Sequence, residues 1–211
     1  MSRSEEYLAA AAPAIDLVDL PQVGTAWSER SALTDWTVGG LAAHLLGQVF
    51  SVTSALAAPV DGAETVSLLA HYAQVPWRGV ALDEPANVRI RSGGAENAEL
   101  GQVPLVDRAR AELAALAAVL PGLAGDRVVR APWNPWALAL DDFLTTRLME
   151  IAVHSDDLAV SVGVAPPALP EAVHRAVRHL LVDLSAQRHG DTAVLRALAR
   201  AERAPASIAA L

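Results

Sequence analysis

The chain has 211 residues, a formal net charge of −8 and a hydrophobic fraction of 53%. This length suits one domain with a sizeable core, and the 16 bases, all arginines, form no block that would suggest a nucleic-acid partner. The absence of cysteine excludes disulfides, thiolate metal sites and a cysteine nucleophile.

The N-terminal stretch "MSRSEEYLAAAAPAIDLVDL" is interrupted by acidic residues and does not resemble a secretion signal, which needs a basic start and an unbroken apolar core. No uninterrupted apolar run reaches the ~18 residues of a membrane-spanning helix. We therefore expect a cytoplasmic protein that has neither a membrane nor a nucleic acid as its partner.

The first half of the chain predicts three helical segments. Residues 4–20 are helical in pattern but contain Pro13. A long helix begins after Thr37, a typical N-cap residue, because apolar residues then repeat at every third and fourth position as far as Leu56. A weaker helix is expected over residues 63–74.

The second half predicts an irregular connection, a short extended element and further helices. Residues 75–103 show no clear period and are expected to be irregular. The segment "RVVRAPWNPWALAL" has two prolines and two tryptophans and suggests a small extended element. Helices are expected over residues 105–120, 140–162 and 168–188, followed by a short one in "GDTAVLRALARAER".

This order of elements predicts an all-α protein, since strands and helices do not alternate. The expected architecture is a four-helix bundle with additional C-terminal helices. Residues 1–165 would form the bundle and residues 166–211 a C-terminal helical extension packed on it. The connection at 75–103 is too long for an ordinary bundle loop, which makes it a candidate cover for an active site.

A polar stripe runs along the otherwise apolar helix at 140–162. Glu150, His154 and Asp157 stand at positions i, i+4 and i+7 and so share one face. One interpretation is a structural network that pairs Glu150 with Arg147 and His154 with Asp157. The other is a metal site, since Glu and His one turn apart can bind one ion, and a further ligand would have to come from another helix. Among the six histidines, His44 lies on a long core helix.

Two stretches resemble the signatures of a known family. "LTDWTVGGLAAHLLGQ" and "TTRLMEIAVHSDDLAVSVG" are similar, in sequence, order and separation, to those of the mycothiol-dependent maleylpyruvate isomerase family, within the DinB-like superfamily. The similarity covers about residues 5–165. The C-terminal "HGDTAVLRALARAER" resembles a short extension found in some members, not the separate C-terminal domain of the isomerase itself.

The resemblance implies a DinB-like bundle that binds a divalent metal, usually zinc, through His44, Glu150 and His154. Three protein ligands leave one coordination position open, as in catalytic zinc sites. The family's cosubstrate is mycothiol, whose sulfur would be held as a thiolate and would attack an electrophilic carbon of a small substrate. Expulsion of the sulfur after bond rotation would give isomerisation, and retention would give S-transfer.

Four further residues are candidates for the site. Asp157 is a candidate catalytic residue that would orient His154, although a solvated acid at the end of the bundle explains it equally well. Arg147, the second catalytic candidate, and Arg78 would receive carboxylates of the substrate or thiol, unless each is a structural arginine. Trp77 is the tryptophan best suited to line a cleft.

The function expected from the resemblance is a metal-dependent, mycothiol-using transferase or isomerase. Two alternatives stay open: a DinB-like metal-binding module without thiol chemistry, and a metal-dependent hydrolase that activates water. The expected partners are a small-molecule substrate and the thiol, and the protein would be a monomer or a homodimer. The sequence does not identify the substrate.

Overall fold

The structure is a computed structural model that describes all 211 residues. Its elements, in chain order, are α1 (Arg3–Val18), α2 (Pro21–Thr25), α3 (Val38–Ala57), α4 (Leu68–Gln74), α5 (Pro85–Ala98), α6 (Gln102–Val119), the 3-10 helix η1 (Leu120–Gly122), β1 (Val128–Val129), β2 (Leu138–Ala139), α7 (Leu140–Val162), α8 (Glu171–His189), α9 (Asp191–Ala199) and the 3-10 helix η2 (Ala201–Arg203). The fold is all-α apart from one two-stranded antiparallel element, which confirms the predicted fold class.

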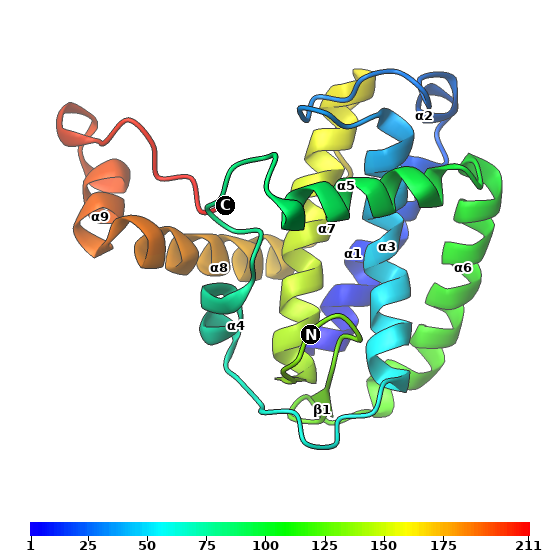
Figure 1. Ribbon diagram of the computed structural model, residues 1–211, viewed down its shortest axis with the longest axis horizontal. Helices are drawn as coiled ribbons and strands as arrows, with labels where there is room; N and C mark the ends of the chain where they lie inside the picture. The colour runs from blue at the N-terminus through cyan, green and yellow to red at the C-terminus, as the bar shows by residue number, and fades with distance from the viewer.

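Four long helices, α1, α3, α6 and α7, form the bundle (Figure 1). Helix α7 contacts α1 and α3, and α6 contacts the same two helices on the other side, so the four close into a ring. Their apolar faces meet in one hydrophobic cluster of 40 buried residues. Burial of apolar surface on this scale is the main force that holds the helices together.

The long core helices begin and end close to where the sequence predicts them. Thr37 caps α3, since its side-chain oxygen accepts a hydrogen bond from the backbone N–H of Gly40 at 3.0 Å. Helix α7 spans the predicted residues, and Gly163 ends it in the left-handed conformation, with a φ of 68°. The strands β1 and β2 lie in the segment expected to be extended and lead directly into α7.

The prediction that residues 75–103 are irregular is wrong, because α5 occupies much of this segment. Pro85 stands in its first turn, where a missing N–H costs nothing. Helix α5 crosses α3 and contacts it closely (Figure 1). At the crossing, a Cβ added to Gly94 would lie 2.9 Å from the backbone oxygen of Gly40. The two helices therefore meet through glycines, and this contact leaves no periodic pattern of large apolar residues.

Helix α3 is long and apolar enough, by length and composition, to cross a membrane. In the structure, however, most of its apolar residues are buried against the other helices of the bundle. The helix therefore has the environment of the core helix of a bundle, in which apolar side chains are expected on nearly all sides.

The C-terminal helices differ in how they contact the bundle. Helix α8 packs against α7 and also contacts α1 and α4. Helix α9 contacts α8 and projects away from the bundle (Figure 1). The chain then turns back, so that residues 208–211 lie along α8, where Ser185 donates a hydrogen bond to the carbonyl of Ile208 at 2.8 Å.

Candidate metal centre

Three side chains from two helices converge inside the bundle. Glu150 and His154 lie one turn apart on α7, and the packing of α3 against α7 brings His44 to the same place. The carboxylate oxygen Oε2 of Glu150 lies 3.1 Å from Nε2 of His154 and 3.5 Å from Nε2 of His44. The convergence of His44 on this pair, expected from the family resemblance, is therefore present in the geometry.

The three side chains are enclosed but not sealed. Their exposed fractions are 21% for His44, 12% for Glu150 and 18% for His154. The two imidazole rings lie edge to face with their centroids 4.9 Å apart, and the indole of Trp36 lies 5.3 Å from the ring of His44. The cluster is therefore partly exposed to solvent, with aromatic rings on part of its surroundings.

Asp157 fixes the orientation of His154. Its carboxylate oxygen Oδ2 lies 3.0 Å from Nδ1 of His154, so this nitrogen carries a proton and donates it in a hydrogen bond. The opposite nitrogen, Nε2, is thereby directed toward Glu150 and His44. A carboxylate behind a metal-binding histidine is the common arrangement in protein zinc sites, where it holds the ring and raises its basicity.

The ionisable side chains of the cluster change one another's pKa values. Burial lowers the pKa of His154, but the hydrogen bonds to Asp157 and Glu150 outweigh burial and raise this pKa to about 9. Burial also acts to raise the pKa of Glu150, yet the hydrogen bonds from His154 and His44 hold it well below its usual range. Burial lowers the pKa of His44. At neutral pH the metal-free cluster is thus an imidazolium and a carboxylate beside a neutral imidazole.

The donor set fits a divalent ion such as zinc. Two imidazole nitrogens and one carboxylate oxygen are the ligands of many catalytic zinc sites, which keep a further position open. Zinc bonds of about 2.0–2.1 Å place the ligands of a tetrahedral ion about 3.3 Å from each other. The distances from Oε2 of Glu150 to the two histidine nitrogens, 3.1 and 3.5 Å, bracket this value.

Arg147 lies beside the cluster but forms no ion pair with Glu150. The Glu150–Arg147 pair of the structural network that the sequence suggested is therefore absent. Its guanidinium donates to Oε1 of Gln48 at 2.6 Å and to the hydroxyl of Thr146 at 3.0 Å, and it lies over the ring of Phe143. All of these partners are neutral. The second pair of that network, His154 with Asp157, is present.

Arg78 has a structural position. Its guanidinium donates hydrogen bonds to the carbonyls of Tyr72, Leu184 and Ala210 and to the side chain of Gln187. These contacts connect α4, α8 and the C-terminal residues. These four hydrogen bonds engage most of the five N–H groups of the Arg78 guanidinium within the chain itself, and its role in binding a substrate stays a prediction.

Trp77 is half-buried and packs against the core cluster, with its indole edge-on to Tyr72 at a centroid distance of 6.2 Å. Gln48 is a residue near the cluster that the sequence prediction missed. Its side-chain nitrogen donates to the carbonyl of His44 at 2.9 Å, and its oxygen accepts from Arg147. The available signal was its place one turn after His44 on a helix with few other polar residues.

A comparison with known families agrees with this geometry. A family model described as the mycothiol maleylpyruvate isomerase N-terminal domain matches residues 8–159, a range that includes His44, Glu150 and His154. Searches among curated proteins and among solved structures found no match. The matched range covers α3 and α6 completely, most of α1 and α7, and well over half of the chain. The chain therefore belongs to the mycothiol maleylpyruvate isomerase N-terminal domain family.

Proposed function

We propose that this protein is a cytoplasmic, metal-dependent enzyme that uses mycothiol either to isomerise a small electrophilic substrate or, as an S-transferase, to attach the thiol to it. The observation that carries the proposal is the convergence of His44, Glu150 and His154 at one accessible point of the bundle. The membership of the chain in a mycothiol isomerase family supports the thiol as cosubstrate.

In this proposal His44, Glu150 and His154 would hold a divalent ion, most simply zinc. Such an ion would lower the pKa of a thiol from its free value of about 8.5 and would so favour the nucleophilic thiolate near neutral pH. Asp157 keeps the proton on Nδ1 of His154, so that Nε2 is free of a proton when the ion is bound. The enclosure of the cluster limits access of water that would compete with the substrate.

Arg147 is proposed to bind a carboxylate of the substrate or of the thiol. Its guanidinium donates to Oε1 of Gln48, and the nitrogen of the same Gln48 amide lies 3.5 Å from Nε2 of His44, which supports a role beside the centre. Its hydrogen-bond partners, Gln48 and Thr146, leave its positive charge without a carboxylate. Because a guanidinium binds carboxylates with paired hydrogen bonds, an anionic group would be oriented beside the metal by this residue.

The test is a calorimetric titration of the zinc-loaded protein with mycothiol, repeated after the metal has been removed with a chelator. The proposal expects binding to the loaded protein and little or none to the metal-free protein, followed by turnover of maleylpyruvate or a related conjugated electrophile. Zinc binding without mycothiol binding would contradict the thiol chemistry and would favour a hydrolase or a simple metal-binding module.

A further inference from the structure

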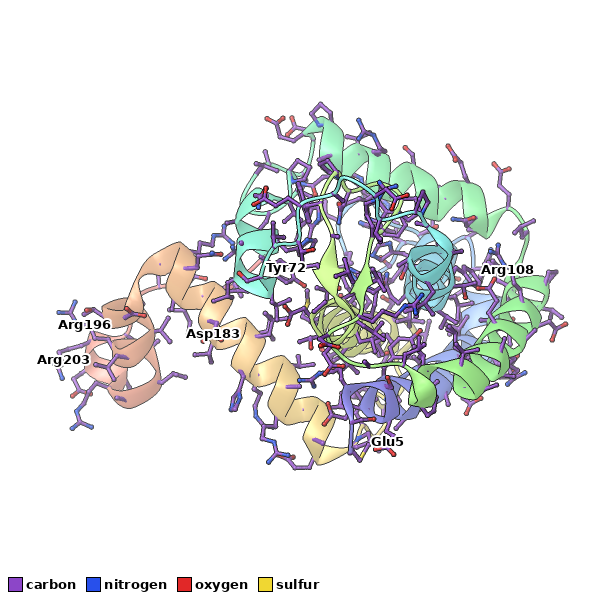
Figure 2. All side chains as sticks on the ribbon, turned by 90° about the horizontal axis from the view of Figure 1, so that it is seen from below. Glu5, Tyr72, Arg108, Asp183, Arg196 and Arg203 are labelled. Atoms are coloured by element: carbon purple, nitrogen blue, oxygen red, sulfur yellow. The ribbon has the colours of Figure 1, made fainter.

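Helix α9 and η2, residues 190–203, project from the bundle as an arm that lies outside the range matched by the family. Within the chain, α9 makes its main contacts with α8 and η2, and Val194 is its only buried residue. Figure 2 shows Arg196 and Arg203 at the far end of the arm, away from the bundle. Isolated helices shorter than about 12–15 residues are marginally stable in water, so a helix of 9 residues with so little buried surface needs a further partner.

The fold holds the arm at both of its ends. At the first end, Gly190 separates α9 from α8 in a conformation with a φ of 85°. At the second end the chain returns to α8, where the carbonyl of Ile208 accepts a hydrogen bond from Ser185 at 2.8 Å. The carbonyl of Ala210 accepts another from Arg78 at 3.1 Å. The projecting position of the arm is therefore fixed by contacts on either side of it.

The arm exposes large apolar side chains. Leu195 and Leu198, three residues apart on one face of α9, are 67% and 68% exposed. The whole chain exposes 10464 Å², about 1,100 Å² more than the roughly 9,300 Å² expected of a compact monomer of 22.1 kDa. A stable interface buries about 800 Å² on each partner. The excess surface is therefore sufficient for one interface of ordinary size.

Charge is divided unevenly between the bundle and the C-terminal residues. Residues 1–165 carry 20 acidic residues and 10 arginines, a net charge of −10, whereas residues 166–211 carry 4 and 6, a net charge of +2. On the arm, Arg196, Arg200 and Arg203 are exposed, and the ion pairs within the chain all involve other residues. The arm therefore fits an acidic partner, and the bundle of a second copy of this chain is acidic.

A surface of matching character lies at residues 79–88, which lead from α4 into α5 and which we call the acidic segment. Its backbone is held in place, since the side chain of Asn87 donates to the carbonyl of Ala81 at 2.9 Å. Asp83 and Glu84 are exposed and take part in none of the ion pairs of the chain. The same segment exposes three large apolar side chains, those of Val80, Leu82 and Val88. Apolar and acidic groups thus stand together here, as apolar and basic groups do on the arm.

We propose that two copies of this chain form a dimer in which the arm of each copy docks on the acidic segment of the other. Leu195 and Leu198 cover the apolar side chains of that segment, and the arginines of the arm pair with Asp83 and Glu84. The same two surfaces are used twice about a twofold axis, so the assembly closes at two chains. The inference is independent of the candidate metal centre.

The first test is sedimentation equilibrium of the wild type and of variants of the arm. The wild type is expected to be a dimer at about 10 μM. Leu195→Ser combined with Leu198→Ser should raise the dimer Kd about 100-fold or more, because the leucines of both arms lose their apolar contacts. Val103→Ser is the control, since Val103 is 62% exposed on α6, outside both surfaces, and the Kd should not change. A monomeric wild type, or a dimer that the double variant leaves intact, would overturn the proposal.

The second test exchanges the charges of the two surfaces. One variant carries Arg200→Glu with Arg203→Glu, and the other carries Asp83→Arg with Glu84→Arg. Each variant alone should be monomeric with the Tm of a wild-type monomer, because like charges meet at both contacts. An equimolar mixture should form a heterodimer with about the wild-type Kd, since each contact again joins opposite charges. Folded variants that do not associate when mixed would show that the arm does not dock on the acidic segment.

An apolar and basic arm could also bind an anionic membrane surface, and cosedimentation with vesicles of phosphatidylglycerol and phosphatidylcholine separates the two cases. The dimer should remain in solution, because its arms are covered by the partner. If the wild type is instead monomeric and sediments with the vesicles, and Leu195→Ser with Leu198→Ser abolishes this binding, the arm belongs to a membrane contact and the dimer is overturned.

Discussion

The proton on Nδ1 of His154 determines which nitrogen this histidine can offer to a metal. Asp157 accepts that proton at 3.0 Å, and the ring therefore directs Nε2 toward Glu150 and His44. In the metal-free protein, Nε2 is also protonated near neutral pH, because the two carboxylates raise the pKa of His154 to about 9. A metal must therefore displace one proton, and two predictions follow from this competition.

Asp157→Asn should lower the affinity for zinc about 10- to 100-fold, since the ring loses the carboxylate that holds it and raises its basicity. Competition with a chromophoric zinc chelator measures this change. Asp156→Asn is the matched control, because Asp156 is the exposed neighbour of Asp157. Equal zinc affinities for the two variants would show that Asp157 does not act on His154 in this way.

Zinc affinity should increase with pH by up to about tenfold per unit between pH 6.5 and 9 and level off above. The reason is that His154 is protonated below its pKa of about 9, and deprotonation frees Nε2. The same raised pKa stabilises the metal-free fold below pH 6.5, and that contribution is lost as the pH rises through about 9. Zinc titrations in buffers across this range measure the affinity, and an affinity that does not change with pH would contradict the prediction.

At the scale of elements, the crossing of α3 and α5 explains both a correct and an incorrect prediction. Helix α3 was predictable, because Thr37 caps it and large apolar residues repeat along it. Helix α5 was not, because it meets α3 through Gly94 and Gly40 and buries little apolar surface of its own. A helix is recognised in a sequence by apolar residues that recur along one face. A contact between glycine backbones needs no such residues, so the sequence shows no apolar face there.

Gly94→Ala should therefore destabilise the protein by about 1–3 kcal/mol, as overpacking does. The added Cβ would lie 2.8 Å from the ring of Trp36 and 2.9 Å from the oxygen of Gly40. Gly93→Ala is the control, because nothing lies within 4 Å of a Cβ at that position, and alanine should stabilise the helix by up to about 1 kcal/mol. Urea unfolding of both variants should give opposite signs, and equal effects would contradict this packing.

At the scale of the molecule, two of the three candidate metal ligands could be predicted from local helix geometry. Glu150 and His154 share a helix face by spacing alone, whereas the convergence of His44 depends on how α3 packs against α7 and was expected only from the family resemblance. The position of Arg78 depends on contacts with residues more than one hundred positions away in the chain. Such contacts follow from tertiary packing and leave no local pattern.

Arg78→Ala should lower the free energy of unfolding by about 1–3 kcal/mol, because several carbonyls of α4, α8 and the C-terminal segment lose their donor. Its zinc affinity should be unchanged. Arg89→Ala, at an exposed position of α5, is the control and should change neither quantity. If Arg78→Ala is as stable as the wild type but binds the substrate more weakly, Arg78 is instead a substrate-binding residue.

If His44, Glu150 and His154 together hold one divalent ion, calorimetric titration of the chelator-treated protein with zinc should show it directly. We predict one high-affinity site per chain. We also predict that His44→Ala, Glu150→Ala and His154→Ala each weaken zinc binding by more than about 100-fold, which is more than the loss of a supporting residue costs. His179→Ala, which removes an exposed histidine on α8, should bind zinc as the wild type does. Absence of a high-affinity site, or a site that survives all three substitutions, would show that these residues do not form a metal centre.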